Sequence, residues 1–220
     1  IADWDFPGAE REFRRALDLN PNYVWAHDWY GFYLAVMGRF DDSLRELHRA
    51  LELDPLSPAI SNDIADVYRF AGRLEQSLQQ HRKTFEIDPN FSLGHVLEGV
   101  AFRDHGQLDK AIASFQTALR IDDRDSLALA LLGNAYGRAG KRDQALRILD
   151  QLQARSQTSY VSPYFLAIVW AGLGDKDQVF HHLEKAYQER FWMNFLKVET
   201  TFAPLRTDPR YAALLRRIGF

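Results

Sequence analysis

The sequence contains no cysteine among its 220 residues. Disulfides, thiolate metal sites and cysteine nucleophiles are therefore excluded, and cysteine usage says nothing about the redox compartment. No apolar run reaches the roughly 18 residues that a membrane-spanning helix needs. The first ten residues have neither a basic nor an apolar stretch, so no signal peptide is visible.

An excess of charge of one sign is also lacking. The 27 basic and 30 acidic residues give a formal net charge of −3, which does not favour nucleic acid as a partner. Hydrophobic residues make up 46% of the chain and aromatic residues 13%. Such a composition is typical of a folded protein with a sizeable core rather than of a disordered chain.

The sequence does contain a regular spacing of glycine and proline. Five glycines recur at one constant interval: Gly38, Gly72, Gly106, Gly140 and Gly174. Three prolines share this interval: Pro21, Pro55 and Pro89. The interval matches the length of a helix–turn–helix repeat, about 34 residues, in which glycine ends the first helix and proline follows the second.

Other positions of the repeating unit agree with this interpretation. When each unit is counted from three residues after its leading proline, position 8 is always small: Gly31, Ala65, Gly99, Gly133 and Ala167. Position 20 is also small, and positions 11 and 24 are mostly bulky. Small residues allow the two helices of a unit to approach closely, and bulky ones fill the space beside them. Asp41, Asp109 and Asp175 follow the glycines and are expected to cap the second helices.

These columns resemble the tetratricopeptide repeat over about residues 9–190. The resemblance implies an all-α, right-handed α-solenoid, with a C-terminal capping helix that begins at Asp208-Pro209. Its expected organisation is a half repeat, five full repeats and a cap: 1–22, 24–57, 58–91, 92–125, 126–159, 160–193 and 194–220. The expected helices are 9–19, 24–37, 41–53, 58–71, 75–87, 92–105, 109–121, 126–139, 143–155, 160–173 and 176–190.

Both ends also resemble the C-terminal repeat region of bacterial multidomain signalling proteins. The ending PLRTDPRYAALLRRIG carries most of this likeness, together with WDFPGAEREF near the start. In that group the array commonly follows a winged-helix DNA-binding domain, a kinase or a nucleotide cyclase, none of which is present in these residues. The resemblance implies an excised part of a longer bacterial, cytoplasmic protein.

The half repeat at the N-terminus has no first helix of its own. Phe13 and Leu17 are therefore expected to be partly uncovered. Either Trp4 and Phe6 fold back over this face, or another chain covers it. The second alternative predicts self-association.

The resemblance implies that the first helices of the repeats line a concave groove. The candidate ligand-contacting residues at groove-facing positions are Trp25, Asp28, Phe32, Asn62, Asp66, Arg69, Arg103, Asn134 and Arg138. Arg69, Arg103 and Arg138 occupy one line on consecutive helices and suit carboxylates of an acidic partner. Alternatively, these arginines are solvated, or paired with Asp66 and Asp104.

The aromatic end of the groove leaves two interpretations open. Trp25, Trp29 and Phe32 are either anchors for a ligand side chain or packing partners of helix 9–19. Some tetratricopeptide domains bind a C-terminal carboxylate through Lys and Asn at positions 5 and 9. Only Asn134 fits that pattern here, which argues against this mode of binding.

The sequence contains no motif that indicates an enzyme active site. The glycines of GNAYGRAG fall at helix-packing positions rather than in a phosphate loop, and His181-His182 has no pattern that completes a metal site. We therefore expect no catalytic residue, metal or cofactor. The expected function is a scaffold that binds a protein or peptide, without membrane or nucleic-acid contacts, and self-association or a regulatory role in a larger protein is the alternative.

Overall fold

A computed structural model describes residues 5–191 and 193–220. This part of the chain is helical, contains no strand, and is an α-solenoid of helical repeats. The elements are α1 (Phe6–Leu19), α2 (Val24–Val36), α3 (Phe40–Leu53), α4 (Pro58–Phe70), α5 (Leu74–Ile87), α6 (Ser92–Asp104), α7 (Leu108–Ile121), α8 (Ser126–Arg138), α9 (Arg142–Ser156), α10 (Pro163–Leu173), α11 (Lys176–Gln188), the 3-10 turns η1 (Met193–Phe195) and η2 (Ala203–Leu205), and α12 (Pro209–Arg217). Every repeat helix expected from the glycine and proline spacing is confirmed, with boundaries close to the expected ones.

The turn glycines are required by backbone conformation rather than by space. All five have φ between 72° and 81°, in the left-handed region, while a Cβ added there would meet no atom within 4 Å. Glycine adopts this region without steric penalty, so the chain can reverse after each first helix. The constant spacing of these glycines along the sequence therefore marks the end of the first helix in each repeat.

The glycines inside the first helices are required by space. A Cβ atom added to Gly31 would lie 2.7 Å from the side chain of Leu47. A Cβ atom added to Gly99 would lie 2.6 Å from the ring of Phe115. Both contacts are shorter than any van der Waals separation, and both join the first helix of a repeat to the second. The expectation that position 8 allows close approach is confirmed.

Helix starts follow the expected chemistry only in part. Asp175 caps α11, since its side chain accepts a hydrogen bond from the Gln178 backbone. Asp41 and Asp109 are not caps, because α3 and α7 already begin one residue before them. These two carboxylates instead lie in the first turn, where they interact favourably with the positive end of the helix dipole.

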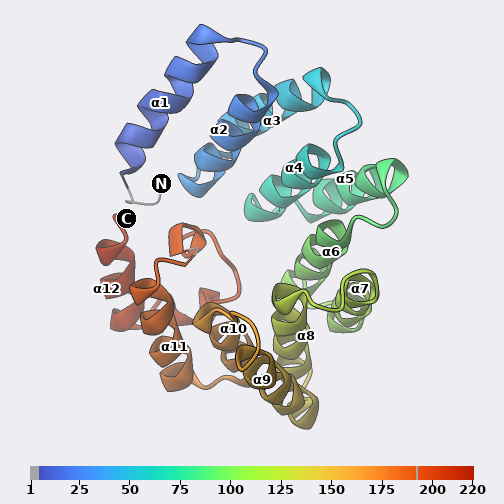
Figure 1. Cartoon of the computed structure of the whole chain (residues 1–220), viewed down its shortest axis with the longest axis vertical. Helices are drawn as coiled ribbons and strands as arrows, with labels where there is room; N and C mark the ends of the chain where they lie inside the picture. Colours follow the sequence, from blue (N-terminus) through green and yellow to red (C-terminus); the bar gives the residue numbers. More distant parts are fainter. Residues whose placement is uncertain (1–4, 192) are drawn as a thin grey trace. The chain divides into compact units, whose positions relative to one another are not determined.

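Contacts divide the chain into two compact units within α6. Unit 1 runs to Leu97 and unit 2 from Glu98 to Ile218. In unit 1, α2 packs on α3 and α4 on α5, and in unit 2, α8 packs on α7, α9 and α10 (Figure 1). A cluster built from Leu47, Ile64 and Val67 forms part of the core of unit 1, where α3 meets α4.

The incomplete N-terminal repeat is covered partly by its own residues. Phe6 is buried, and its carbonyl oxygen accepts a 3.0 Å hydrogen bond from the Tyr33 hydroxyl. Phe13 contacts Tyr30 and Tyr33, with ring centroids 5.7 and 5.8 Å apart. Phe6 is the first residue of α1, so it extends the helix rather than folding back over it, and Trp4 lies outside the described residues.

At the other end of the chain, α12 packs against α11 in the place expected of a capping helix. The guanidinium of Arg217 donates to both carboxylate oxygens of Glu184 at 2.7 and 2.8 Å and lies over the Tyr187 ring. The guanidinium of Arg210 lies 4.1 Å above the ring of Phe180. These contacts cover the outer side of the last repeat.

Replacing Ala111 by Leu should lower the free energy of unfolding by about 1–3 kcal/mol, because this fully buried position has no room for three more carbon atoms. Urea denaturation measures the change. Ala113→Leu on the exposed face of the same helix is the matched control and should change stability by less than about 0.5 kcal/mol. Equal effects of the two substitutions would contradict the placement of Ala111.

Candidate protein-binding surfaces

Two indoles are exposed on the first helix of the first full repeat. Trp25 and Trp29 lie one turn apart on α2 and are 50% and 57% exposed. Both indoles therefore keep a large apolar surface in contact with solvent, although neither is fully exposed. Phe32, one turn further along the same face, is half-buried.

Beside this aromatic pair lies a pair of carboxyl groups. Asp28 on α2 is buried, and its carboxyl group interacts with that of Asp63 on α4. Burial raises the pKa of Asp28 to about 6. Burial also raises the pKa of Asp63 well above its usual range, and the negative charges of Asp28 and Asp66 add to this shift. The two groups thus share a proton more readily than they ionise together.

Sequence reasoning selected Asp28 but not Asp63, which occupies position 6 of its repeat rather than position 5. The available signal was the spacing of Asp63 and Asp66, which lie on the same side of α4. Two neighbouring carboxylates at a groove-facing position indicate an unusual electrostatic environment.

The remaining polar residues of α4 are also buried. Arg69 donates from Nε to Asp66 Oδ1 at 2.6 Å, and its guanidinium lies 4.3 Å from the Phe70 ring centroid. The alternative that Arg69 pairs with Asp66 is confirmed. Asn62 is fully buried, and neither polar atom of its side chain has a hydrogen-bond partner in the described part of the chain. A buried amide without partners is unfavourable, and full burial also keeps the Asn62 amide out of reach of a ligand on the surface.

In unit 2, Arg103 is covered by a segment from the end of the chain. Its Nη1 donates to Thr201 Oγ1 at 2.8 Å and its Nη2 to Thr200 Oγ1 at 3.1 Å. Asp104 accepts from both Arg103 and Thr200, at 2.8 and 2.6 Å. Arg103 is 0% exposed as a result, so it is neither solvated nor paired with Asp104 alone.

Aromatic contacts hold the same segment. Phe202 is fully buried, and its ring packs edge to face on Tyr164 of α10 with the centroids 5.6 Å apart. Tyr164 occupies position 5 of the fifth repeat, a groove-facing position. The chain thus places residues 199–202 on first helices of its own repeats.

Arg138 differs from the other two arginines. It is exposed and has no ion pair within residues 5–191 and 193–220. Partial burial lowers its pKa first, and the positive charge of Arg103 lowers it further. Arg138 therefore lies close to Arg103 and remains able to bind a carboxylate.

Asn134 has a structural contact that the sequence did not indicate. Its amide nitrogen donates to the Ile168 carbonyl oxygen at 2.8 Å, which links α8 to α10. The nearby glycines serve packing, since a Cβ on Gly137 would lie 2.5 Å from the backbone of Gly172. The interpretation of GNAYGRAG as a packing motif is confirmed.

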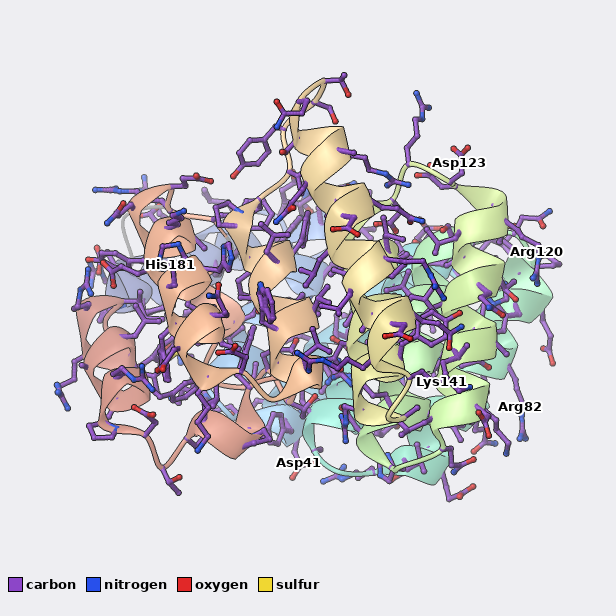
Figure 2. The ribbon with its side chains drawn as sticks, turned by 90° about the horizontal axis from the view of Figure 1, so that it is seen from below. Asp41, Arg82, Arg120, Asp123, Lys141 and His181 are labelled. Atoms are coloured by element: carbon purple, nitrogen blue, oxygen red, sulfur yellow. The ribbon has the colours of Figure 1, made fainter. Side chains whose placement is uncertain are left out.

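The two adjacent histidines do not form part of a larger cluster. His181 is exposed on α11 (Figure 2), and its ring meets that of His182 edge to face. Burial and the neighbouring His181 lower the pKa of His182 to about 4. Among the described residues, no three or more His, Asp or Glu side chains are grouped to hold a metal ion.

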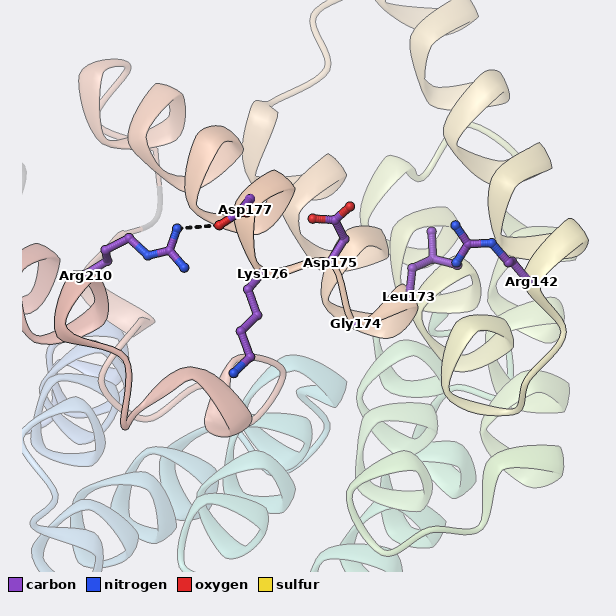
Figure 3. Close-up of a pocket in the computed structure, with 7 residues that line it drawn as sticks. All are labelled: Arg142, Leu173, Gly174, Asp175, Lys176, Asp177 and Arg210. Atoms are coloured by element: carbon purple, nitrogen blue, oxygen red, sulfur yellow. Dashed lines mark hydrogen bonds and ion pairs between the residues drawn. The ribbon is translucent and has the colours of Figure 1, made fainter.

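A polar hollow lies at the start of α11 (Figure 3). Its lining residues are Arg142, Leu173, Gly174, Asp175, Lys176, Asp177 and Arg210. Arg210 already donates to Asp177 at 2.7 Å and to Asp208, and Asp175 caps the helix. Arg210, Asp177, Asp208 and Asp175 therefore already have partners within the chain. We do not regard the hollow as a candidate catalytic or ligand-binding site.

None of the helices in the described residues is both long and apolar enough to cross a membrane.

The carboxyl pair makes stability depend on pH. Because the folded state keeps a proton on Asp28 up to about pH 6, whereas the ordinary value is 3.8, stability falls as the pH rises through this window. Asp28→Asn removes this effect while keeping a hydrogen-bond acceptor. We expect the substitution to raise the free energy of unfolding at pH 7 by about 1–2 kcal/mol, and the gain to vanish near pH 4.

Urea denaturation at several pH values measures this difference, with the exposed Asp18→Asn in α1 as control. A gain that stays constant from pH 4 to pH 7 would show that the carboxyl pair is not the cause.

Comparisons with known proteins agree with the helical repeat. Residues 33–90 and 102–162 match two models of the tetratricopeptide repeat, and together they cover just over half of the chain. A search of curated proteins found no match.

Solved structures of repeat proteins are similar in fold. A thermophilic TPR protein of Thermus thermophilus is 22% identical over 88% of this chain and 99% of its own, with a TM-score of 0.62. A tetratricopeptide repeat protein of Parabacteroides merdae is 17% identical over 98% of this chain and 88% of its own, with a TM-score of 0.58. A chain of the APC/C hetero-tetramer Cut9–Hcn1 is 17% identical over 98% of this chain and 40% of its own, with a TM-score of 0.63.

Sequence identities this low to the solved structures show a shared fold only. The two tetratricopeptide-repeat models, by contrast, match the amino-acid sequence of this chain directly. The chain therefore belongs to the tetratricopeptide-repeat proteins, helical scaffolds that generally mediate protein–protein interaction and typically carry no catalytic activity.

Proposed function

We propose that this chain is a scaffold that binds a peptide or helix of a partner protein on the first-helix faces of its repeats. The observation that carries the proposal is the exposed pair Trp25 and Trp29, next to the buried carboxyl of Asp28. Tryptophan is enriched among the residues that dominate binding energy, because a large rigid surface becomes buried at little entropic cost.

The surroundings of the two indoles support this proposal. Leu19 and Tyr23, in and after the end of α1, are 78% and 47% exposed, so large apolar side chains gather at the start of the first full repeat. Exposed apolar groups of this density beside polar ones are typical of interaction surfaces.

A second face favours acidic partners. Of the three arginines predicted to bind carboxylates, Arg138 is exposed and lacks an ion pair in the described residues. Arg69 and Arg103 would contribute only if a ligand displaced their present partners. An acidic ligand is thus proposed for unit 2 rather than for the whole line of arginines.

The alternative is self-association, or a regulatory role within a bacterial, cytoplasmic signalling protein such as a transcriptional regulator, kinase or cyclase. Its support is the resemblance of the two ends, together with the N-terminal half repeat. Sedimentation velocity distinguishes self-association from partner binding, because only the former changes the mass of the isolated chain with concentration.

The proposed function predicts that Trp25→Ala/Trp29→Ala abolishes retention of a specific partner from extracts of the producing cell, while the melting temperature changes little. Leu56→Ala, a substitution at another exposed apolar residue, is the matched control and should retain the partner. Affinity purification with quantitative mass spectrometry provides the measurement. Equal retention by the double variant and the control would rule out this surface.

A further inference from the structure

The segment Glu199–Phe202 occupies a face that tetratricopeptide repeats present to partners, and it belongs to no helix. It lies between η1 and η2, outside the periodic part of the sequence. Its side chains contact groove-facing positions of α6, about 97 residues earlier in the chain, and of α10. The segment is therefore held on unit 2 as a ligand would be, but through a covalent tether.

The first three residues of the segment, Glu199, Thr200 and Thr201, make polar contacts with α6 and with one another. Glu199 accepts from the backbone and hydroxyl of Thr201, and one of its oxygens lies 3.6 Å from the Arg103 guanidinium. Thr201 and Thr200 accept from Arg103, and Thr200 donates to Asp104. The order of groups along the segment is a carboxylate, two hydroxyls and an aromatic ring.

The receiving face is complementary to this order. The buried guanidinium of Arg103 donates to Thr200 and Thr201 and pairs ionically with Glu199, and Asp104 supplies the acceptor that the Thr200 hydroxyl needs. Tyr164 supplies the edge-to-face partner of Phe202. A fork of donors beside one acceptor selects hydroxyl and carboxylate groups over apolar side chains.

We propose that unit 2 recognises, in a partner protein, an acidic segment with two hydroxyl residues and an aromatic residue after a carboxylate, and that Glu199–Phe202 occupies this site until such a partner displaces it. This inference rests on the proposed function, since it names the chemistry of one ligand and its regulation.

Because the segment Glu199–Phe202 is part of the same chain, a partner needs additional contacts to displace it. A segment attached by a short linker competes at an effective concentration on the order of millimolar, so a partner with only the same four residues would be outcompeted. Arg138 lies near Arg103 and Asp104 and forms no direct ion pair in the described residues, so it can still bind a carboxylate while the tethered segment is in place. A second carboxylate in the partner would pair with Arg138 and supply the missing affinity.

The test uses a fluorescent peptide with the sequence of residues 197–204 and a second peptide in which its first residue, lysine, is replaced by glutamate. Fluorescence anisotropy measures binding of each to the full chain. Thr200→Val/Thr201→Val removes the hydroxyl contacts of the tethered segment with nearly unchanged volume, and Thr207→Val, at an exposed threonine outside the contact, is the control. Phe202→Ala provides an independent way to loosen the segment.

We expect both peptides to bind the Thr200→Val/Thr201→Val and Phe202→Ala variants at least tenfold more tightly than the parent and the Thr207→Val control. The glutamate peptide should bind more tightly than the first peptide, and adding Arg138→Gln should remove that advantage. Adding Arg103→Gln should abolish binding of both.

Equal binding to loosened and parent chains would overturn the competition, and no binding to folded, loosened variants would overturn the recognition. Concentration-dependent dimers of the parent chain that dissociate on adding the peptide would overturn the partner class in favour of a second copy of this chain. None of these outcomes depends on Trp25 and Trp29. The peptide experiment can therefore fail while the affinity purification with the Trp25→Ala/Trp29→Ala variant succeeds, and the reverse.

Discussion

The close approach of the two helices in each repeat is the constraint on which the rest of the structure depends. There is no room for a Cβ at Gly31 or Gly99, because Leu47 and Phe115 from the second helix occupy that space. The helices can pack this closely only if the chain reverses within a short turn, and the left-handed turn glycines permit this. Core contacts thus join each helix to its neighbours in sequence, as expected for a repeat fold.

This arrangement leaves one face of each first helix outside the apolar core. In unit 1 that face carries polar groups in costly environments: Asp28 and Asp63 share a proton, and the Asn62 amide has no partner in the described residues. An apolar residue would be more favourable at any of these positions if folding alone mattered.

In unit 2 the equivalent face is satisfied from within the chain. Arg103 would be an isolated buried charge without Asp104, Thr200 and Thr201, and a buried unpaired guanidinium is strongly unfavourable. The segment that satisfies it lies outside the helices of the repeats, and only short local turns join it to η1 and η2. A ligand with the same groups could replace it without reorganising the helices, because the contacts of the segment come from side chains rather than from the repeat backbone.

The sequence by itself determined the repeats, since glycine conformation, proline and small residues act locally and recur at a constant interval. Helix boundaries and the packing role of Gly137 followed from these local rules. Sequence reasoning misjudged Asp41 and Asp109, because a helix can begin just before the residue that resembles its cap.

Only the tertiary structure decided which groove-facing residues are available. Arg103 and Arg138 were both predicted to face the groove, yet one is buried and the other exposed. Thr200 and Thr201, which lie outside the periodic sequence and far along the chain, cover Arg103. Contacts between a periodic scaffold and a non-periodic segment leave no pattern in the sequence, because no local rule links residues so far apart.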